Sequence, residues 1–182
     1  MHILRNIGVA CLLVGVTGCG STPNNYHTLV QPRPAHAAGP AIEVARVSVP
    51  PQVDRPQIVV RAGANSLSIL ETEWWGATLA DEFKSALQDQ LGGSPVVSPH
   101  EVLKVDVQRF DSVPGQYALL DAVWYLKRAG GDGVTCRTSV RTAAENGVPG
   151  MVGAHQANIR KLAADISAAA GAGGGCSEGM KH

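Results

Sequence analysis

An amphipathic helix between two groups of strand-like segments is the feature that most limits how this chain can fold. Large apolar side chains recur every four residues, at Trp75, Leu79, Phe83, Leu87 and Leu91. This spacing places them on one side of a helix and predicts a helix over 75–91 that ends at Gly92-Gly93. Each such side chain contributes roughly 1.5–3 kcal/mol when buried. The stripe is therefore predicted to face the core, whereas Trp74 lies off it.

Strand-like segments precede this helix. Residues 42–49 form a β-rich run that Pro50-Pro51 stops. Residues 58–62 and 66–70 flank Gly63-Ala64-Asn65, which has the length and composition of a hairpin loop. The pattern predicts one strand and then a hairpin before the helix.

Alternating segments also follow the helix. They predict strands at 103–107, 118–126 and 134–140 in an antiparallel meander whose second turn is rich in glycine. A final helix places Val152, His155, Ile159, Leu162 and Ile166 on one stripe, with His155 expected at its boundary and not as a ligand. The order β-β-β-α-β-β-β-α predicts an α+β fold, with about six strands in one mixed or antiparallel sheet and both helices packed on one face.

The N-terminus has the regions of an export signal. Arg5 precedes an apolar run from Ile7 to Val16, and the small pair Thr17-Gly18 comes before Cys19. Such a run rises about 15 Å as a helix, half of a hydrocarbon core of roughly 30 Å, so cleavage is favoured over membrane spanning. A signal peptide over 1–18 is predicted, and a plain secretory peptide cut elsewhere is the alternative.

The segment VTGC, from Val16 to Cys19, resembles a bacterial lipobox, in which the cysteine thiol accepts diacylglycerol. Cys19 is therefore the predicted lipidation site. The residues after it are rich in Gly, Pro, Asn and Ser, so 19–40 is predicted to be a flexible tether. Several acyl chains make such anchoring effectively permanent. Gly20 stands where Asp would signal inner-membrane retention, so an outer-membrane anchor with the domain facing the periplasm is expected.

Composition and residue spacing argue against several functions. Lys and Arg balance Asp and Glu at 15 each, which leaves no excess charge to attract nucleic acid. No nucleophile motif is present, and the six histidines have no metal-ligand spacing. No catalytic residue, cofactor or metal is predicted. The folded domain is expected over 41–170 and a Gly-rich disordered tail over 171–182.

Two further cysteines, Cys136 and Cys176, follow the predicted lipidation site. An oxidising periplasm permits a disulfide between them. However, Cys136 lies on the apolar phase of its strand, where a free cysteine also packs well, and Cys176 lies in the tail. The sequence leaves both states open.

Several segments together resemble the PqiC family, also described as the ABC-type transport auxiliary lipoprotein component. They are DRPQIVVR at 54–61, the 75–91 helix, DVQRFD at 106–111 and LDAVWYL at 120–126. The resemblance spans about residues 42–166. It implies a non-catalytic adaptor that works with an MCE-domain protein of an intermembrane lipid transport system supporting envelope integrity.

The resemblance and the loop chemistry together predict a partner-binding region. Asp54, Arg55 and Gln57, with Trp74, are the candidates, because an aromatic side chain beside charged loop residues suits an interface. A structural reading has equal weight, in which Asp54 caps, Arg55 pairs locally and Pro56 fixes the turn. The alternative function is a lipid-binding or envelope-assembly lipoprotein unrelated to MCE transport, and a homo-oligomer stays open.

Overall fold

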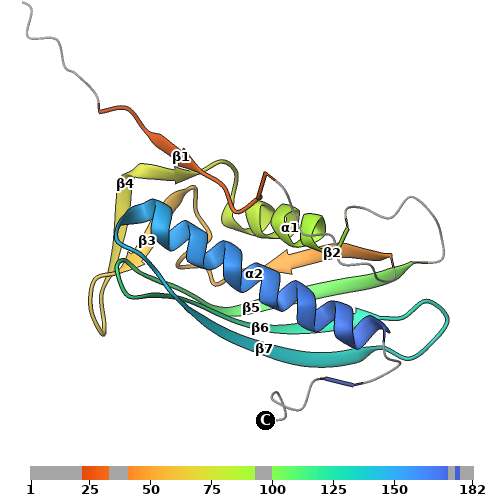
Figure 1. The fold of residues 1–182 in the computed structure, drawn as a ribbon. Helices are drawn as coiled ribbons and strands as arrows, with labels where there is room; N and C mark the ends of the chain where they lie inside the picture. Colours follow the sequence, from red (N-terminus) through yellow and green to blue (C-terminus); the bar gives the residue numbers. More distant parts are fainter. Residues whose placement is uncertain (1–21, 33–40, 93–99, 172–174, 177–182) are drawn as a thin grey trace, which may run out of the picture.

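The computed structural model describes residues 22–32, 41–92, 100–171 and 175–176. Within these residues two sheets form, with strand orders β1-β4-β3 and β2-β5-β6-β7, and both helices lie against one face of the four-stranded sheet (Figure 1). The elements are β1 (Asn25–His27), β2 (Ile42–Ser48), β3 (Gln57–Arg61), β4 (Leu67–Trp75), α1 (Leu79–Gln90), β5 (Glu101–Val113), β6 (Tyr117–Lys127), β7 (Val134–Ala143) and α2 (Gly147–Gly171). The α+β class and the placement of the helices are confirmed.

Strand pairing differs from the prediction in one respect. The meander of β5, β6 and β7 is antiparallel, and β3 and β4 form the predicted hairpin. The single sheet of about six strands is wrong, because the hairpin pairs with β1 and forms a sheet of its own. β2 instead completes the meander sheet by pairing in parallel with β5.

Helix α1 begins later than predicted. Trp75 is the last residue of β4, and Thr78 caps the helix by accepting a hydrogen bond from the Asp81 backbone N–H. The apolar stripe nevertheless faces the core, because Trp75, Leu79, Phe83, Leu87 and Leu91 are all buried. Trp75 belongs to the strand and still fits the four-residue spacing of the stripe, because β4 ends at Trp75 and α1 begins four residues later, at Leu79.

His155 on α2 lies in the core and not at the predicted boundary. Its ring stacks on Phe110 with centroids 3.8 Å apart, and its Nε2 lies 2.9 Å from the Ser112 hydroxyl. Both partners belong to β5, so α2 lies flat across the sheet and covers this position completely. Burial lowers the pKa of His155 to about 3, and the ring is therefore neutral near pH 7.

Part of the predicted tether belongs to the folded domain. Strand β1 pairs in parallel with β4, and His27 Nε2 lies 2.5 Å from Glu73 Oε2. The Glu82 carboxylate accepts hydrogen bonds from the Thr28 hydroxyl and from the backbone N–H of the buried Leu29. The prediction of a flexible tether over 19–40 is therefore wrong for its middle part. Residues 1–21, with Cys19, and 33–40 lie outside the described residues.

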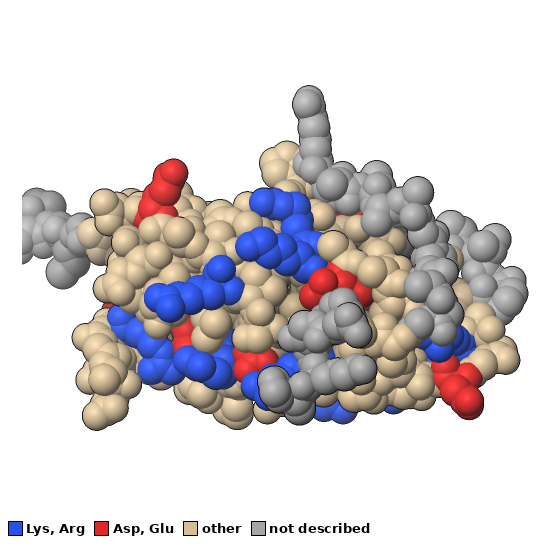
Figure 2. Space-filling model, turned by 60° about the horizontal axis from the view of Figure 1, so that its bottom comes forward, with Lys and Arg blue, Asp and Glu red and all other residues tan. Residues whose placement is uncertain are grey.

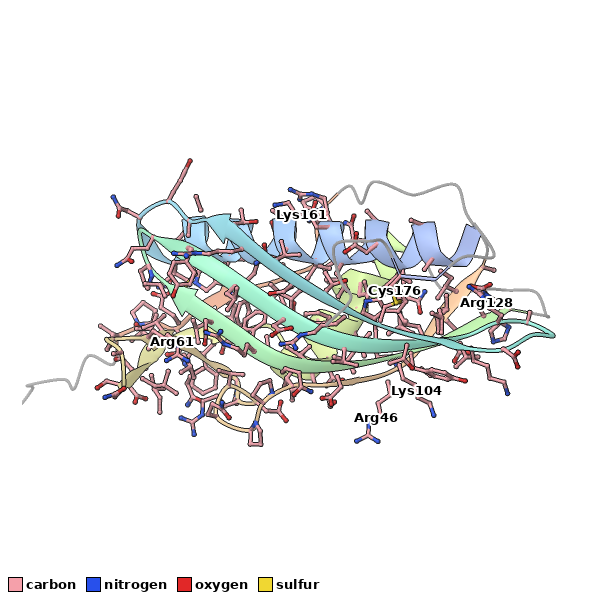
Figure 3. The ribbon with its side chains drawn as sticks, turned by 90° about the horizontal axis from the view of Figure 1, so that it is seen from below. Arg46, Arg61, Lys104, Arg128, Lys161 and Cys176 are labelled. Carbon is pink, nitrogen blue, oxygen red and sulfur yellow. A yellow bond between two sulfur atoms is a disulfide. The ribbon has the colours of Figure 1, made fainter. Side chains whose placement is uncertain are left out.

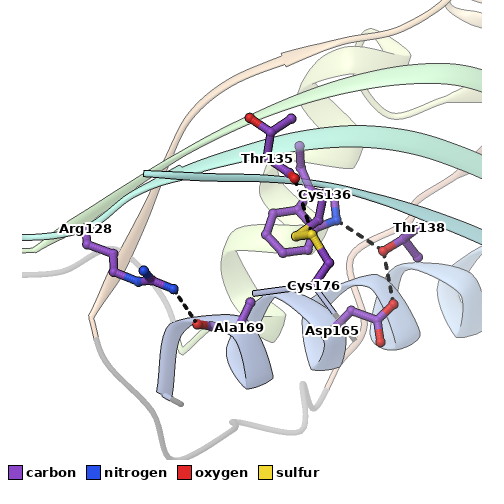
Figure 4. Close-up of a disulfide and its surroundings, with 8 residues drawn as sticks. Arg128, Thr135, Cys136, Thr138, Asp165, Ala169 and Cys176 are labelled. Atoms are coloured by element: carbon purple, nitrogen blue, oxygen red, sulfur yellow. Dashed lines mark hydrogen bonds between the residues drawn. A yellow bond between two sulfur atoms is a disulfide. The ribbon is translucent and has the colours of Figure 1, made fainter. Parts of the chain in front are cut away.

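A disulfide joins Cys136 of β7 to Cys176, which follows α2 (Figure 4). Of the two states that the sequence leaves open, the structure has the bonded one. The cysteines are 40 residues apart, so the bond ties the chain beyond α2 to the sheet, and the predicted disorder of the tail does not hold at Cys176. Nearby, the Thr138 hydroxyl donates to Asp165 and the Arg128 guanidinium donates to the Ala169 carbonyl, which also join the sheet to α2.

Candidate partner-binding surface

The structure brings the predicted partner-binding residues together on the three-stranded sheet. Gln57 of β3 is opposite Trp74 of β4, and the Trp75 backbone N–H donates to the Pro56 carbonyl at 2.7 Å. The pairing then shifts, because Ile58 is opposite Leu70, so β4 carries extra residues at this point. Such a bulge re-aims the side chains around it. Here it places Trp74 opposite Gln57, where the 54–57 segment enters β3.

The Trp74 ring is held in place by its own strand and by β1. Its indole N–H donates to the Glu71 carbonyl at 2.8 Å. Tyr26 of β1 is opposite Trp74, with ring centroids 6.5 Å apart, and is 67% exposed. Sequence reasoning missed Tyr26, because only the pairing of β1 with β4 brings it here. We use the name partner surface for Tyr26, Asp54, Arg55, Gln57 and Trp74.

A tight turn presents the charged part of the partner surface. The backbone N–H groups of Val53 and Asp54 both donate to the Pro50 carbonyl. Asp54 is exposed and Arg55 is half-buried. Neither forms an ion pair with any residue that the structure describes, so the local pairing considered for Arg55 is not found. Both charges are therefore free to contact a partner.

The hydrogen-bonded Ser112 and His155 have residue types that occur in catalytic pairs, but they lie in the core. Both side chains are buried, and His155 Nδ1 has no hydrogen-bond partner among the described residues. A nucleophilic serine needs access to its substrate and a base that a third group orients. The geometry of this pair meets neither requirement, and its role is to pack α2 on β5.

The described residues offer neither a metal-ligand cluster nor a membrane-spanning helix. No group of three or more His, Cys, Asp and Glu side chains within them is arranged to hold a metal ion. None of the helices in the described ranges is both long enough and apolar enough to cross a bilayer.

Comparisons with known proteins agree with this fold. The family model of the ABC-type transport auxiliary lipoprotein component matches residues 27–167. The crystal structure of an uncharacterized protein aligns with a TM-score of 0.65 at 18% sequence identity, over 81% of this chain and 98% of the other. A DUF330 protein from Xanthomonas campestris aligns with a TM-score of 0.56 at 18% identity, over 80% and 91%. These structures share the fold. No curated protein matches the chain in sequence.

Proposed function

The chain belongs to the ABC-type transport auxiliary lipoprotein family, and from this membership we propose that it is a non-catalytic adaptor anchored in the outer membrane. Its partner in this proposal is an MCE-domain protein of an intermembrane lipid transport system. The observation that carries the proposal is the partner surface, where an exposed tyrosine, a half-buried tryptophan and charged turn residues gather. Aromatic and arginine side chains are the residue types that most often dominate binding energy at interfaces.

One form of the alternative function, in which an acyl chain is enclosed between the two sheets, has less support. The hollow beside Val59, Leu67 and Phe110 lies between the two sheets and measures about 50 Å³. Sites that enclose a ligand of ordinary size measure roughly 300–1,000 Å³. This hollow is therefore too small for an acyl chain.

Replacing Trp74 or Arg55 by Ala is expected to weaken binding of the MCE-domain protein encoded beside this chain by about thirtyfold, which corresponds to about 2 kcal/mol. Co-purification followed by a titration with the purified partner would measure the loss. Tyr125→Ala and Arg160→Ala are matched controls, because these exposed residues lie on other elements, β6 and α2.

The controls are expected to bind as the wild type does, and thermal melts should show that all variants are folded. Wild-type binding by both folded test variants would remove the partner surface from the proposal. A wild-type protein that binds no MCE-domain protein but hydrolyses an envelope substrate would contradict the adaptor role altogether.

Lipidation at Cys19 is the second expectation of this proposal. Mass spectrometry of the mature N-terminus should find a diacylglyceryl-modified Cys19 as the first residue. Cys19→Ser should release the protein from the outer-membrane fraction, because the acyl chains supply the anchoring energy. An unmodified N-terminus that begins at another residue, or a Cys19→Ser protein retained in that fraction, would exclude the lipid anchor.

A further inference from the structure

Cations gather on the face of the four-stranded sheet that the helices leave open (Figure 2). The outward positions of this sheet carry the cations Arg46, Lys104, Arg109, Lys127, Arg137 and Arg141 and the carboxylates Glu43, Asp106, Asp111 and Asp121. This face is therefore net positive, whereas the remainder of the described chain is net negative. The balanced composition of the whole chain conceals this asymmetry.

We propose that one end of this face is a binding site for a phosphate group, lined by Arg61 and Arg109, with Arg141 beside it on the Tyr117 ring. Arg61 ends β3 and lies near the junction of the two sheets (Figure 3), and the other two arginines come from β5 and β7. An open hollow of about 670 Å³ is lined by Arg61, Arg109 and Tyr117. The Arg141 guanidinium lies over the Tyr117 ring, 3.7 Å from its centroid. Two guanidinium groups thus line one hollow, and a third stacks on the ring of Tyr117, which also lines it.

Asp111 orients two of these arginines. Its Oδ1 lies 2.9 Å from Arg61 Nε and its Oδ2 lies 2.5 Å from Arg109 Nη2. The carboxylate is only 9% exposed, whereas the Arg109 side chain is 54% exposed. Each guanidinium has five N–H donors, so most donors of both groups remain for a ligand. The single carboxylate offsets one positive charge, so Arg61, Arg109 and the adjoining Arg141 together keep two.

A phosphate group fits this arrangement better than a carboxylate ligand does. A phosphomonoester carries about −1.5 to −2 charges at pH 7 and three strong acceptor oxygens, which matches two uncompensated guanidinium charges. Guanidinium groups also bind phosphate oxygens in pairs. The hollow contains the polar Gln116 in addition to the arginines, and it lies at the opposite end of β3 from Gln57 of the partner surface. The site is thus independent of the adaptor role proposed above.

Two probes would test the site and identify the source of the phosphate. The protein would be the mature chain with Cys19→Ser, so that no acyl anchor can hold it on vesicles. Isothermal titration calorimetry with inorganic phosphate tests a soluble ligand. Co-sedimentation with phosphatidylcholine vesicles, with and without phosphatidic acid, tests a lipid headgroup. The expected result is saturable binding of at least one probe, with no binding to vesicles of phosphatidylcholine alone.

Two arginine variants and one control make the test specific. Arg109→Gln and Arg141→Gln are each expected to weaken binding about tenfold or more, because each removes one charge-assisted contact. Arg46→Gln removes an exposed arginine of the same face outside the hollow and should change binding less than about twofold. Arg141 has no carboxylate partner among the described residues, so its variant keeps the test valid if Arg109→Gln lowers stability.

Two results would overturn the proposal. One is a wild-type protein that binds neither inorganic phosphate nor vesicles with phosphatidic acid. If Arg141→Gln also abolishes co-purification with the MCE-domain protein in that case, the arginines contact the protein partner and not a phosphate group. The other is an equal loss of binding in Arg46→Gln and Arg141→Gln, which would show a diffuse attraction to the whole face.

Discussion

Replacing Phe83 by Ala is expected to lower the free energy of unfolding by about 3–5 kcal/mol. Phe83 is fully buried on α1, and its ring meets Phe110 of β5 edge-on with centroids 6.5 Å apart. Truncation leaves a cavity between this helix and the four-stranded sheet. Because a domain of this kind is stable by only about 5–15 kcal/mol, the loss is a large part of the total. Urea denaturation monitored by circular dichroism would measure it.

Ser85 supplies the control on the same helix. It is exposed, and Ser85→Ala should change the free energy of unfolding by less than about 0.5 kcal/mol. A loss below about 1 kcal/mol for Phe83→Ala would mean that the side chain does not fill the core as the structure places it.

Removing the disulfide with Cys176→Ser is expected to cost about 2–4 kcal/mol. The bond closes a loop between residues 40 apart, and α2 lies within that loop. Without the bond the unfolded chain gains conformational freedom, and the end of α2 loses a covalent tie to β7. Denaturation of the oxidised protein and of the variant, both carrying Cys19→Ser, would measure the difference.

Reduction provides an independent check on this difference. A thiol reductant should destabilise the Cys19→Ser protein by about as much as Cys176→Ser does and should not change the variant further. Equal stability of the oxidised protein and the variant would show that the bond contributes nothing to the free energy of unfolding.

The elements that the sequence predicts well are those with a local period. The α1 stripe and the alternation in β5, β6 and β7 depend on neighbours a few residues away, so they are visible in the chain itself. Strand β1 has no such signal, because Asn25–His27 is too short to show alternation. Its position depends on Glu73, which is 46 residues from His27, and on Glu82, which is 53 residues from Leu29.

The candidate sites also divide into residues that the sequence alone reveals and residues that only distant contacts bring together. Residue types alone single out Asp54, Arg55, Gln57 and Trp74, and the β3–β4 register brings them together. No sequence pattern joins Arg61, Arg109 and Arg141, because they come close to one hollow only where strands of both sheets adjoin. His155 likewise has the spacing of a stripe residue, and only its stacking on Phe110 reveals that it is enclosed.

Because the folded domain already begins at β1, only a short segment separates it from the predicted lipidation site. Residues 20–24 are all that separate Cys19 from β1, and six fully extended steps of chain span at most about 21 Å. With lipid on Cys19, the edge where β1 pairs with β4 cannot move farther than this from the membrane surface. The partner surface includes Tyr26 of that strand. If the anchor lies in the outer membrane and the partner is the MCE-domain protein proposed above, that protein has to span most of the periplasm, because residues 20–24 cannot carry the domain far from the bilayer.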